Sequence, residues 1–348
     1  MGISTGAEFA PTTTYLDTAS CGLPPLRARR AVRALAAGLG DGRPGGMEDF
    51  GSVDAARESF ARLVGVAAGR VATGGSVAVH VGLIAASLPP GAEVLFPEGE
   101  FSSVSTPFVV RGDLRARYAP LESLADAVRP GTALVACSAV QSADGRTADL
   151  AAIRAAAAAH GARTLVDATQ AVGWLPFDAS RYDYTVTGAF KWLLCPRGAQ
   201  FLTVTEDAQE ALVPLHAGWL AAADTANSSY GPVTELAPDA RRFDEPPAFL
   251  AYRGAAAALT FIEETGIDAV HAHDTALAAR YRAGLAGIGH APVPGTSPIV
   301  SVPGLGDRQP ALARAGVVTS ARAGHLRAAF HLYNTEADVD RLLDVVSG

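Results

Sequence analysis

Short apolar segments alternate with alanine-rich helical segments through the middle of the chain, and this alternation constrains the fold most strongly. Apolar runs rich in Val, Leu and Phe predict buried strands, whereas the longer alanine-rich runs predict helices. Gly161 follows one of these runs, where a helix C-cap is expected. Strands that alternate with helices are typical of βαβ units, so we expect an α/β fold with a mostly parallel sheet. The predicted strands are 93–96, 133–137, 163–167, 182–187 and 199–204, and the predicted helices are 76–87 and 149–160.

The pattern changes after residue 250. Long helical stretches at 251–265 and 271–285 are followed by a short strand at 299–302 and a closing helix from Thr335. This arrangement predicts a smaller α+β domain at the C-terminus. We expect three parts: an N-terminal segment (1–30) that packs on the small domain, a large domain (31–245) and a small C-terminal domain (246–348).

Composition limits the classes of function. The 348 residues are 49% hydrophobic and 18% charged, enough to bury a large core. The formal net charge is −7 and no basic run is present, so we expect no nucleic-acid partner. Residues 71–92 carry no Asp, Glu, Lys or Arg, but glycines, His80 and two prolines interrupt them, and we expect a loop, a helix and a turn rather than a membrane span.

Cysteine and histidine usage gives expectations about compartment and metals. The three scattered cysteines do not form a disulfide framework or a zinc motif, and the N-terminus lacks the features of a signal peptide, so we expect a cytoplasmic protein. His271, His273 and Asp274 are close in sequence, but the i and i+2 positions of a helix face different sides. We therefore expect no metal site.

Lys191 is the first candidate for chemistry. It follows an apolar strand and a Gly-Ala step, in an arginine-rich chain with few lysines, and it is flanked by Phe190 and Trp192. Ligands bind at the carboxyl ends of strands in open α/β sheets. A lysine in apolar surroundings is partly unprotonated and can form an imine with an aldehyde cofactor. The alternative is an ordinary surface lysine at the end of a strand.

Two further features suit such a cofactor. Asp167 ends a buried strand, where a carboxylate needs a positive or proton-donating partner, and a protonated pyridine nitrogen is one. Gly74, Gly75 and Ser76 precede a predicted helix, whose N-terminus attracts anions such as phosphate. The alternatives are a helix cap or an arginine partner for Asp167, and a simple turn for the glycines. Together the three features point to pyridoxal phosphate.

The same residues resemble those of the class V aminotransferase family, from Tyr15 to Asp340. The order of phosphate loop, acidic strand end and lysine matches, with Lys191 placed 24 positions after Asp167, and residues 327–335 resemble the family's Arg-x-Ser-x-x-x-Tyr-Asn-Thr signature. The resemblance implies a fold-type-I pyridoxal-phosphate-dependent transferase with a seven-stranded sheet. It also implies an amino acid substrate and a homodimer with the site near the subunit interface.

The resemblance implies a role for each matching residue. Lys191 would form the Schiff base and move protons, and Asp167 would bind the pyridine nitrogen. The other implied cofactor contacts are Gln170 to the ring hydroxyl, Phe101 stacked on the ring, and Gly75, Ser76 and Thr187 at the phosphate. The implied substrate contacts are Arg327 and Gln141 at the carboxylate and Trp219 in the pocket wall.

Some residues depart from the family pattern. Only four residues separate Arg322 from Arg327, so the cysteine loop of cysteine desulfurases is missing, which excludes sulfur transfer through a persulfide. Phe190 stands where relatives often have histidine or tyrosine. Glu245-Pro246-Pro247 stands where relatives often have Gly-Thr, which reaches the partner subunit's phosphate.

These features favour an aminotransferase. A β-eliminating C–S lyase and an epimerase of the isopenicillin N epimerase type remain as alternatives, because one carbanion chemistry serves all three reactions. A non-catalytic binding protein is disfavoured by the intact Lys191, Asp167 and Arg327.

Overall fold

A seven-stranded sheet forms the centre of the computed structural model, which describes residues 5–43 and 49–348. The strand order is β2-β8-β7-β6-β5-β3-β4, and every pairing is parallel except the two made by β8. The expected α/β fold with a mostly parallel seven-stranded sheet is thereby confirmed. The strands are β2 (Val71–Gly74), β3 (Glu93–Pro97), β4 (Arg115–Ala119), β5 (Thr132–Ser138), β6 (Arg163–Asp167), β7 (Tyr184–Gly188) and β8 (Gln200–Val204).

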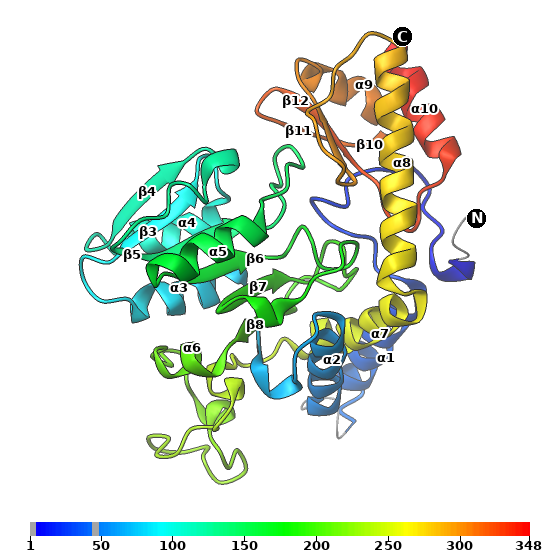
Figure 1. Ribbon diagram of the computed structural model, residues 1–348. Coiled ribbons are helices and arrows are strands. Elements are labelled where there is room, and N and C mark those ends of the chain that lie inside the picture. Colours follow the sequence, from blue (N-terminus) through cyan, green and yellow to red (C-terminus); the bar gives the residue numbers. More distant parts are fainter. Residues whose placement is uncertain (1–4, 44–48) are drawn as a thin grey trace.

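Helices cover both faces of this sheet (Figure 1). Helices α3 (Val77–Ser87) and α4 (Ser102–Val109) share a core with one face, whereas α5 (Leu150–His160) packs on the other. Successive side chains of a strand point to opposite faces, so Leu165 and Val166 enter different cores. Both faces of the central strands are therefore buried, which explains their continuous apolar sequence.

The expected strands and helices of the large domain are present, with boundaries that shift by one or two residues. Helix α5 begins after Asp149, whose side chain accepts from the Ala152 amide at 3.0 Å, and ends at Gly161 with φ 69°. Strands β2 and β4 were not expected. Strand β2 has only four residues, and β4 is an edge strand whose sequence is largely polar and exposed, so neither shows a buried-strand pattern.

A small domain is built around an antiparallel sheet in the order β11-β12-β9. Residue Leu16 of the N-terminal segment lies in the core of this domain, and β1 pairs with β10. The chain start therefore packs on the C-terminal part, over the residues described. The elements are β1 (Thr14–Tyr15), α8 (Ile267–Gly287), β9 (Ile299–Val302), α9 (Gln309–Arg314), β10 (Val317–Val318), β11 (Ser320–Arg322), β12 (His325–Ala329) and α10 (Glu336–Ser347).

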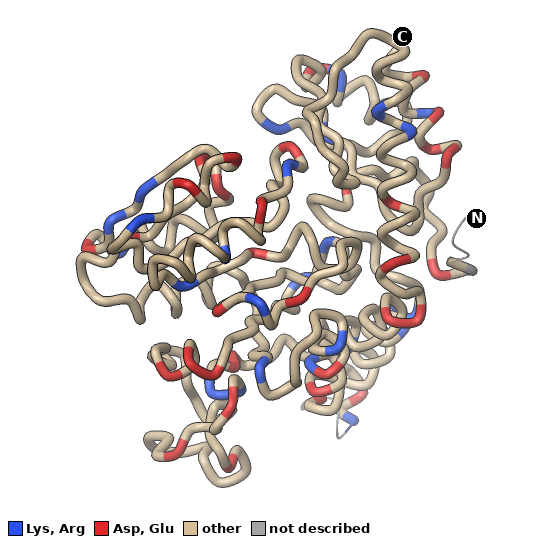
Figure 2. Tube along the Cα trace, in the orientation of Figure 1, with Lys and Arg blue, Asp and Glu red and all other residues tan. Residues whose placement is uncertain are grey.

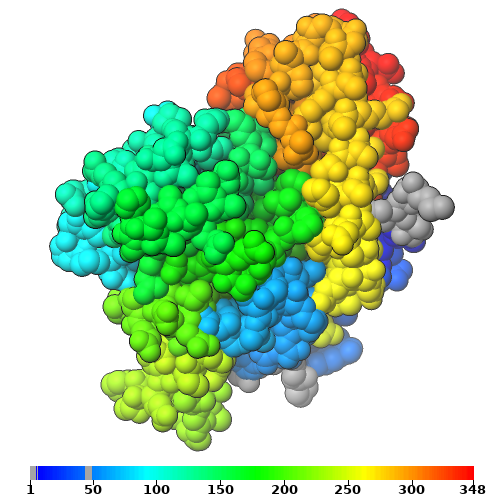
Figure 3. All heavy atoms as spheres, in the orientation of Figure 1, coloured from blue at the N-terminus to red at the C-terminus, as the bar shows by residue number. Residues whose placement is uncertain are grey.

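Helix α7 (Phe249–Thr265) packs against α1 (Leu26–Gly40) and α2 (Phe50–Leu63) rather than on the antiparallel sheet (Figure 1). The long helix α8 then leads from this helical layer to the small domain. Residues 213–236, which follow α6 (Glu206–Glu210), protrude from the large domain (Figure 3). Short 3-10 helices lie at Gly6–Glu8, Ala68–Arg70, Leu121–Ser123, Ala179–Arg181, Trp219–Ala221, Ala240–Phe243 and Gly306–Arg308.

Acidic and basic residues are interspersed along the described chain and form no basic stripe (Figure 2). Among the described residues, no helix is both long and apolar enough to cross a membrane. The same residues contain no cluster of three or more His, Cys, Asp or Glu with the geometry of a metal site.

Candidate active site

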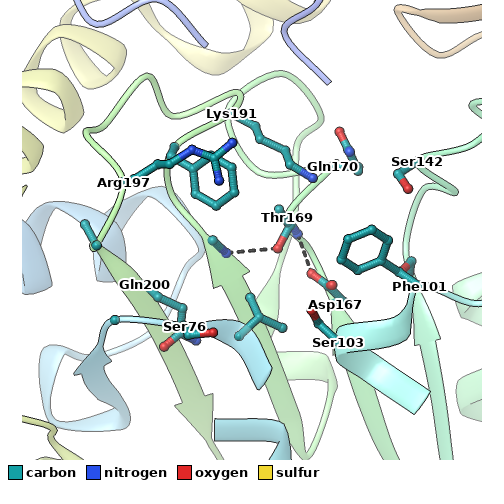
Figure 4. Close-up of a pocket in the computed structure, with 17 residues that line it drawn as sticks. Ser76, Phe101, Ser103, Ser142, Asp167, Thr169, Gln170, Lys191, Arg197 and Gln200 are labelled. Atoms are coloured by element: carbon teal, nitrogen blue, oxygen red, sulfur yellow. Dashed lines mark hydrogen bonds between the residues drawn. The ribbon is translucent and has the colours of Figure 1, made fainter. Parts of the chain in front are cut away.

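A pocket of about 430 Å³ lies at the carboxyl ends of β5, β6 and β7, beside the N-termini of α3 and α4 (Figure 4). This is the edge of an open α/β sheet where ligands bind. The pocket gathers residues that are far apart in the sequence. Its lining is Gly75, Ser76, Val77, Phe101, Ser103, Ser138, Ser142, Asp167, Thr169, Gln170, Gly188, Phe190, Lys191, Arg197, Gly198, Ala199 and Gln200.

Lys191 is the only lysine in the sequence, among 28 lysines and arginines in total. Its Nζ lies 5.5 Å from the ring centre of Phe101 and 5.7 Å from that of Phe190. Burial lowers its pKa to about 8, nearby Asp167 raises it, and three arginines lower it further. No described residue forms a hydrogen bond with Nζ. Lys191 is thus a buried amine that is partly unprotonated near neutral pH and free to react.

The loop that carries Lys191 is held by close backbone contacts. The Gly22 amide donates to the carbonyl oxygen of Phe190 at 2.9 Å. A Cβ atom on Gly22 would lie 2.0 Å from the carbonyl oxygen of Lys191, and one on Gly173 would lie 2.5 Å from that of Trp192. Both positions need glycine, because only a residue without a Cβ atom lets the backbone come this close to the Lys191 loop. Leu194 adopts a φ of 59°, a strained conformation for a leucine beside the site.

Asp167 ends β6 with its carboxylate directed into the pocket (Figure 4). One oxygen accepts a hydrogen bond from the Thr169 amide at 2.9 Å, and no described residue donates to the other. Burial raises the pKa of Asp167, while the Thr169 contacts and Lys191 lower it. A buried carboxylate with a free oxygen suits a protonated ring nitrogen.

Gln170 lies on the pocket wall beside Lys191. Its side-chain amide donates to the carbonyl oxygen of Ala19 at 2.9 Å, and its Oε1 accepts from the indole N–H of Trp192 at 2.7 Å. These bonds fix its orientation. One of its two amide hydrogens remains for a ligand.

The Gly75-Ser76 turn lies at the end of the pocket where helix α3 begins. Ser76 is the N-cap of α3, yet its hydroxyl makes no capping bond and lines the pocket. The Gly75 amide donates to Oε2 of Glu245 at 3.1 Å, and the other oxygen of Glu245 is buried without a partner among the described residues. Glu245 thus holds a carboxylate against an amide of the turn. Thr187 lies outside the pocket, with a buried hydroxyl that has no partner among the described residues.

The expected substrate residues lie in three different places. Arg327 is buried behind the pocket, and Gln141 is bonded to Glu100 through its Nε2 at 3.3 Å. Trp219 does not line this pocket; it lines a second cavity together with Phe50 and Glu245. The structure therefore does not bring Trp219 to Lys191 within one chain.

Arg327 is fixed by its own protein contacts. It donates to Ser142, Ser320 and Ser20, and its Nη2 lies 3.2 Å from Oδ1 of Asp17. Burial lowers its pKa, and Asp17 raises it. The carbonyl that Arg327 contacts belongs to Ser142, which lines the pocket, so one residue separates this guanidinium from the cavity.

Sequence analysis missed several pocket residues, above all Arg197. Strand β8 pairs Gln200 with Gly74 of β2, so the segment before β8 returns beside the Gly75-Ser76 turn. The Arg197 guanidinium lies 4.1 Å from the ring centre of Phe190. The sequence could have indicated Arg197, because it is a cationic residue next to Gly198 and shortly after Lys191. The other polar lining residues not expected are Ser103, Ser138, Ser142, Thr169 and Gln200.

Free groups in the pocket match one cofactor. They are the amine of Lys191, an oxygen of Asp167 and the hydroxyl of Ser76, none of which is used by the described protein residues. An amine suits an aldehyde, a buried carboxylate suits a pyridine nitrogen, and a helix N-terminus with a hydroxyl suits a phosphate. The fold and the site together define a pyridoxal-phosphate-dependent enzyme of fold type I.

The chain belongs to the aminotransferase class-V family, whose model matches residues 52–342. It is 28% identical over 230 residues to the "uncharacterized aminotransferase YcbU" of Bacillus subtilis (strain 168), covering 63% of this chain and 60% of that protein. It is 33% identical over 183 residues to isopenicillin N epimerase of Streptomyces clavuligerus, covering 47% of this chain and 46% of that protein. The chain thus spans about half to three fifths of the length of these curated relatives.

Solved structures share the fold over almost the whole chain. The cystine C–S lyase C-DES, in complex with its product cysteine persulfide, has a TM-score of 0.87 and 23% identity, covering 97% of each chain. The cysteine desulfurase CsdA of Escherichia coli has a TM-score of 0.83 and 21% identity, covering 96% of this chain and 94% of that chain. At these identities, the likeness establishes the fold.

Proposed function

We propose that this enzyme is an aminotransferase that removes and adds the amino group of an amino acid. One observation carries the proposal. Lys191 is the only residue lining the described pocket that is suited to taking up and releasing a proton at a substrate carbon near neutral pH. Asp167 is placed to bind the ring nitrogen, and Arg197 stays protonated.

A single base favours transamination over epimerisation. Transamination needs a proton moved on one face, from the α-carbon of the substrate to the cofactor. Epimerisation through two bases needs a proton donor on each face, and the wall opposite Lys191 presents Phe101 and serine hydroxyls. When bound, the cofactor supplies an aldehyde for amino groups and a ring that draws electrons from the α-carbon.

The other pocket residues are proposed to bind the cofactor and to fix its orientation. Asp167 would keep the ring nitrogen protonated, Gln170 would offer its remaining amide hydrogen to the ring hydroxyl, and Phe101 would pack against the ring. Ser76 and the amides at the start of α3 would hold the phosphate. Thr187 is left without a proposed contact, because it lies outside the pocket.

We assign the α-carboxylate to Arg327 and Ser142. An arginine side chain offers five N–H donors. Four hydrogen bonds to protein groups hold the guanidinium group of Arg327 in place. Arg327→Ala should raise KM by about 100-fold and leave the cofactor absorbance unchanged, because a charged hydrogen bond contributes about 1.5–3 kcal/mol. Gln141 supports this wall through Glu100.

The cofactor link can be tested without an activity assay. Borohydride reduction of the holoprotein followed by peptide mass spectrometry should place the cofactor on Lys191, since the sequence has no other lysine. The variant Lys191→Ala should lose the visible absorbance band and the label. A holoprotein that takes up no pyridoxal phosphate, or carries it elsewhere, would overturn the proposal.

The reaction type needs a separate assay. Each amino acid of a panel is incubated with the holoenzyme, and three products are measured: keto acid with pyridoxamine phosphate, pyruvate with ammonia, and the opposite enantiomer. Stoichiometric keto acid with pyridoxamine phosphate is expected. Pyruvate with ammonia would identify a lyase, and the enantiomer without keto acid would identify an epimerase. Adding methylamine to Lys191→Ala should restore part of the rate if Lys191 moves the proton.

We also propose a cytoplasmic homodimer with the site near its interface. The protruding residues 213–236 expose large apolar side chains, with Tyr230 96% and Leu215 56% exposed. Trp219 lies at the same protrusion, where it is placed to reach a second copy. Analytical ultracentrifugation should show a dimer, and Leu215→Asp with Tyr230→Asp should weaken it.

A further inference from the structure

Three arginines converge on Ser20 at the pocket. Arg327 and Arg322 donate to its hydroxyl at 2.7 Å and 3.1 Å, and Arg197 donates to its carbonyl oxygen at 3.4 Å. These residues come from β12, β11 and the loop after Lys191. The fold thus gathers three guanidinium groups on one residue of the N-terminal segment.

Only one of these charges is balanced. Asp17 pairs with Arg327 at 3.2 Å, whereas Arg197 and Arg322 make no salt bridge within residues 5–43 and 49–348. Both guanidinium groups are exposed, so water and salt screen their mutual repulsion. Because neither has a carboxylate partner among the described residues, both remain available to an anionic ligand.

This surplus of positive charge lies beside the pocket that contains Lys191, where a substrate would bind. Arg197 lines the same pocket as Lys191, and Arg327 reaches it through Ser142. Figure 4 shows Arg197 and Ser142 on opposite sides of the Lys191 side chain. The stacking of Arg197 on Phe190 holds the guanidinium in place before a ligand arrives.

We infer that the substrate is an amino acid with a second acidic group on its side chain. Arg327 binds the α-carboxylate, Arg197 binds the side-chain acid, and Arg322 adds positive charge at the pocket mouth. An amino acid with only an α-carboxylate would leave the guanidinium group of Arg197 without an anionic partner. The inference rests on the proposed function and extends it to a substrate class.

The first experiment uses anions that lack an amino group, so that only binding is measured. The absorbance of the holoenzyme is titrated with succinate and glutarate, and with butyrate and valerate as monoacids of matching chain length. The dicarboxylates should bind about 10- to 100-fold more tightly, as a further charged hydrogen bond predicts. Arg197→Gln should abolish the difference while leaving butyrate binding unchanged.

A control variant separates the local contact from a general change of charge. Arg115 is exposed on edge strand β4 and makes no salt bridge among the described residues. Arg115→Gln should retain the full preference for dicarboxylates. Equal loss in Arg115→Gln and Arg197→Gln would overturn the inference.

The second experiment compares substrates. We expect kcat/KM to be at least about 10-fold higher for aspartate or glutamate than for asparagine or glutamine. Assays with O-phosphoserine and cysteate then show whether a phosphate or a sulfonate is accepted as the side-chain acid. Equal binding of mono- and dicarboxylates by a holoenzyme labelled at Lys191 would overturn the inference and leave the proposed function intact. Loss of cofactor from Arg197→Gln would also overturn it, by assigning Arg197 to the phosphate.

Discussion

The ring of His331 lies 2.9 Å from the carbonyl oxygen of Trp192 and so ties the small domain to the residue next to Lys191. Its other nitrogen is 2.7 Å from Oδ2 of Asp274, and both side chains of this pair are fully buried. A carbonyl oxygen can only accept, so the ring nitrogen beside Trp192 donates, and the other ring nitrogen is hydrogen-bonded to the carboxyl group of Asp274. This contact joins helix α8 and the C-terminal signature to the cofactor loop.

Removing His331 alone should destabilise the protein. His331→Ala leaves Asp274 buried without a partner, and we expect a loss of about 3–5 kcal/mol in the free energy of unfolding, measured with urea. The double variant His331→Ala with Asp274→Ala should lose less than the sum of the single variants. His273→Ala is the control, because His273 is only half-buried. Strict additivity would contradict the pairing.

Lys191 should make stability depend on pH in a defined direction. Its pKa is lowered from 10.5 to about 8, so the unfolded chain binds this proton more tightly than the folded one. The free energy of unfolding of the apoprotein therefore rises as pH increases from about 8 to 10.5. Apo Lys191→Met should be more stable than the wild type by about 3 kcal/mol at neutral pH, and the gain should disappear by the upper end of this range. A gain that does not change with pH would refute the assignment.

Glu245 should oppose cofactor binding. Its carboxylate accepts from the Gly75 amide, which a phosphate also needs, and its negative charge repels that phosphate. Glu245→Gln is expected to tighten the dissociation constant of pyridoxal phosphate by about tenfold, measured by absorbance titration of the apoprotein. Glu235→Gln, at an exposed residue of the protruding segment, should leave it unchanged. Weaker binding by Glu245→Gln would show that Glu245 supports the site.

Gly22 should be essential for the position of the Lys191 loop. A Cβ atom would clash with the Lys191 carbonyl oxygen, so Gly22→Ala should destabilise the protein by about 2–4 kcal/mol and reduce cofactor uptake. Gly38 lies within helix α1, where an added Cβ atom would meet open space, and Gly38→Ala should instead stabilise by up to about 1 kcal/mol. Thermal unfolding of the two variants provides the comparison.

The fold was predictable because its main signals are local. Residues 133–137 are apolar on both faces, as a central parallel strand requires, Leu165 and Val166 do the same for the next strand, and Asp149 and Gly161 mark the ends of a helix. The edge strands β2 and β4 lacked such signals. The packing of α7 on α1 and α2 was also not expected, since a helix's apolar stripe does not state which surface it meets.

The sequence by itself determined the sheet and the order of Ser76, Asp167 and Lys191 along it, because strand ends place these side chains at one edge. Only the tertiary structure decided that Arg197, Arg322 and Arg327 meet at Ser20, that Glu245 reaches the Gly75 turn, and that Trp219 lies in another cavity. These contacts join residues far apart in the chain, and their geometry depends on how loops and domains pack. Lys191 was predicted to be the reactive amine from its neighbours in sequence, whereas the charges around it came from the fold.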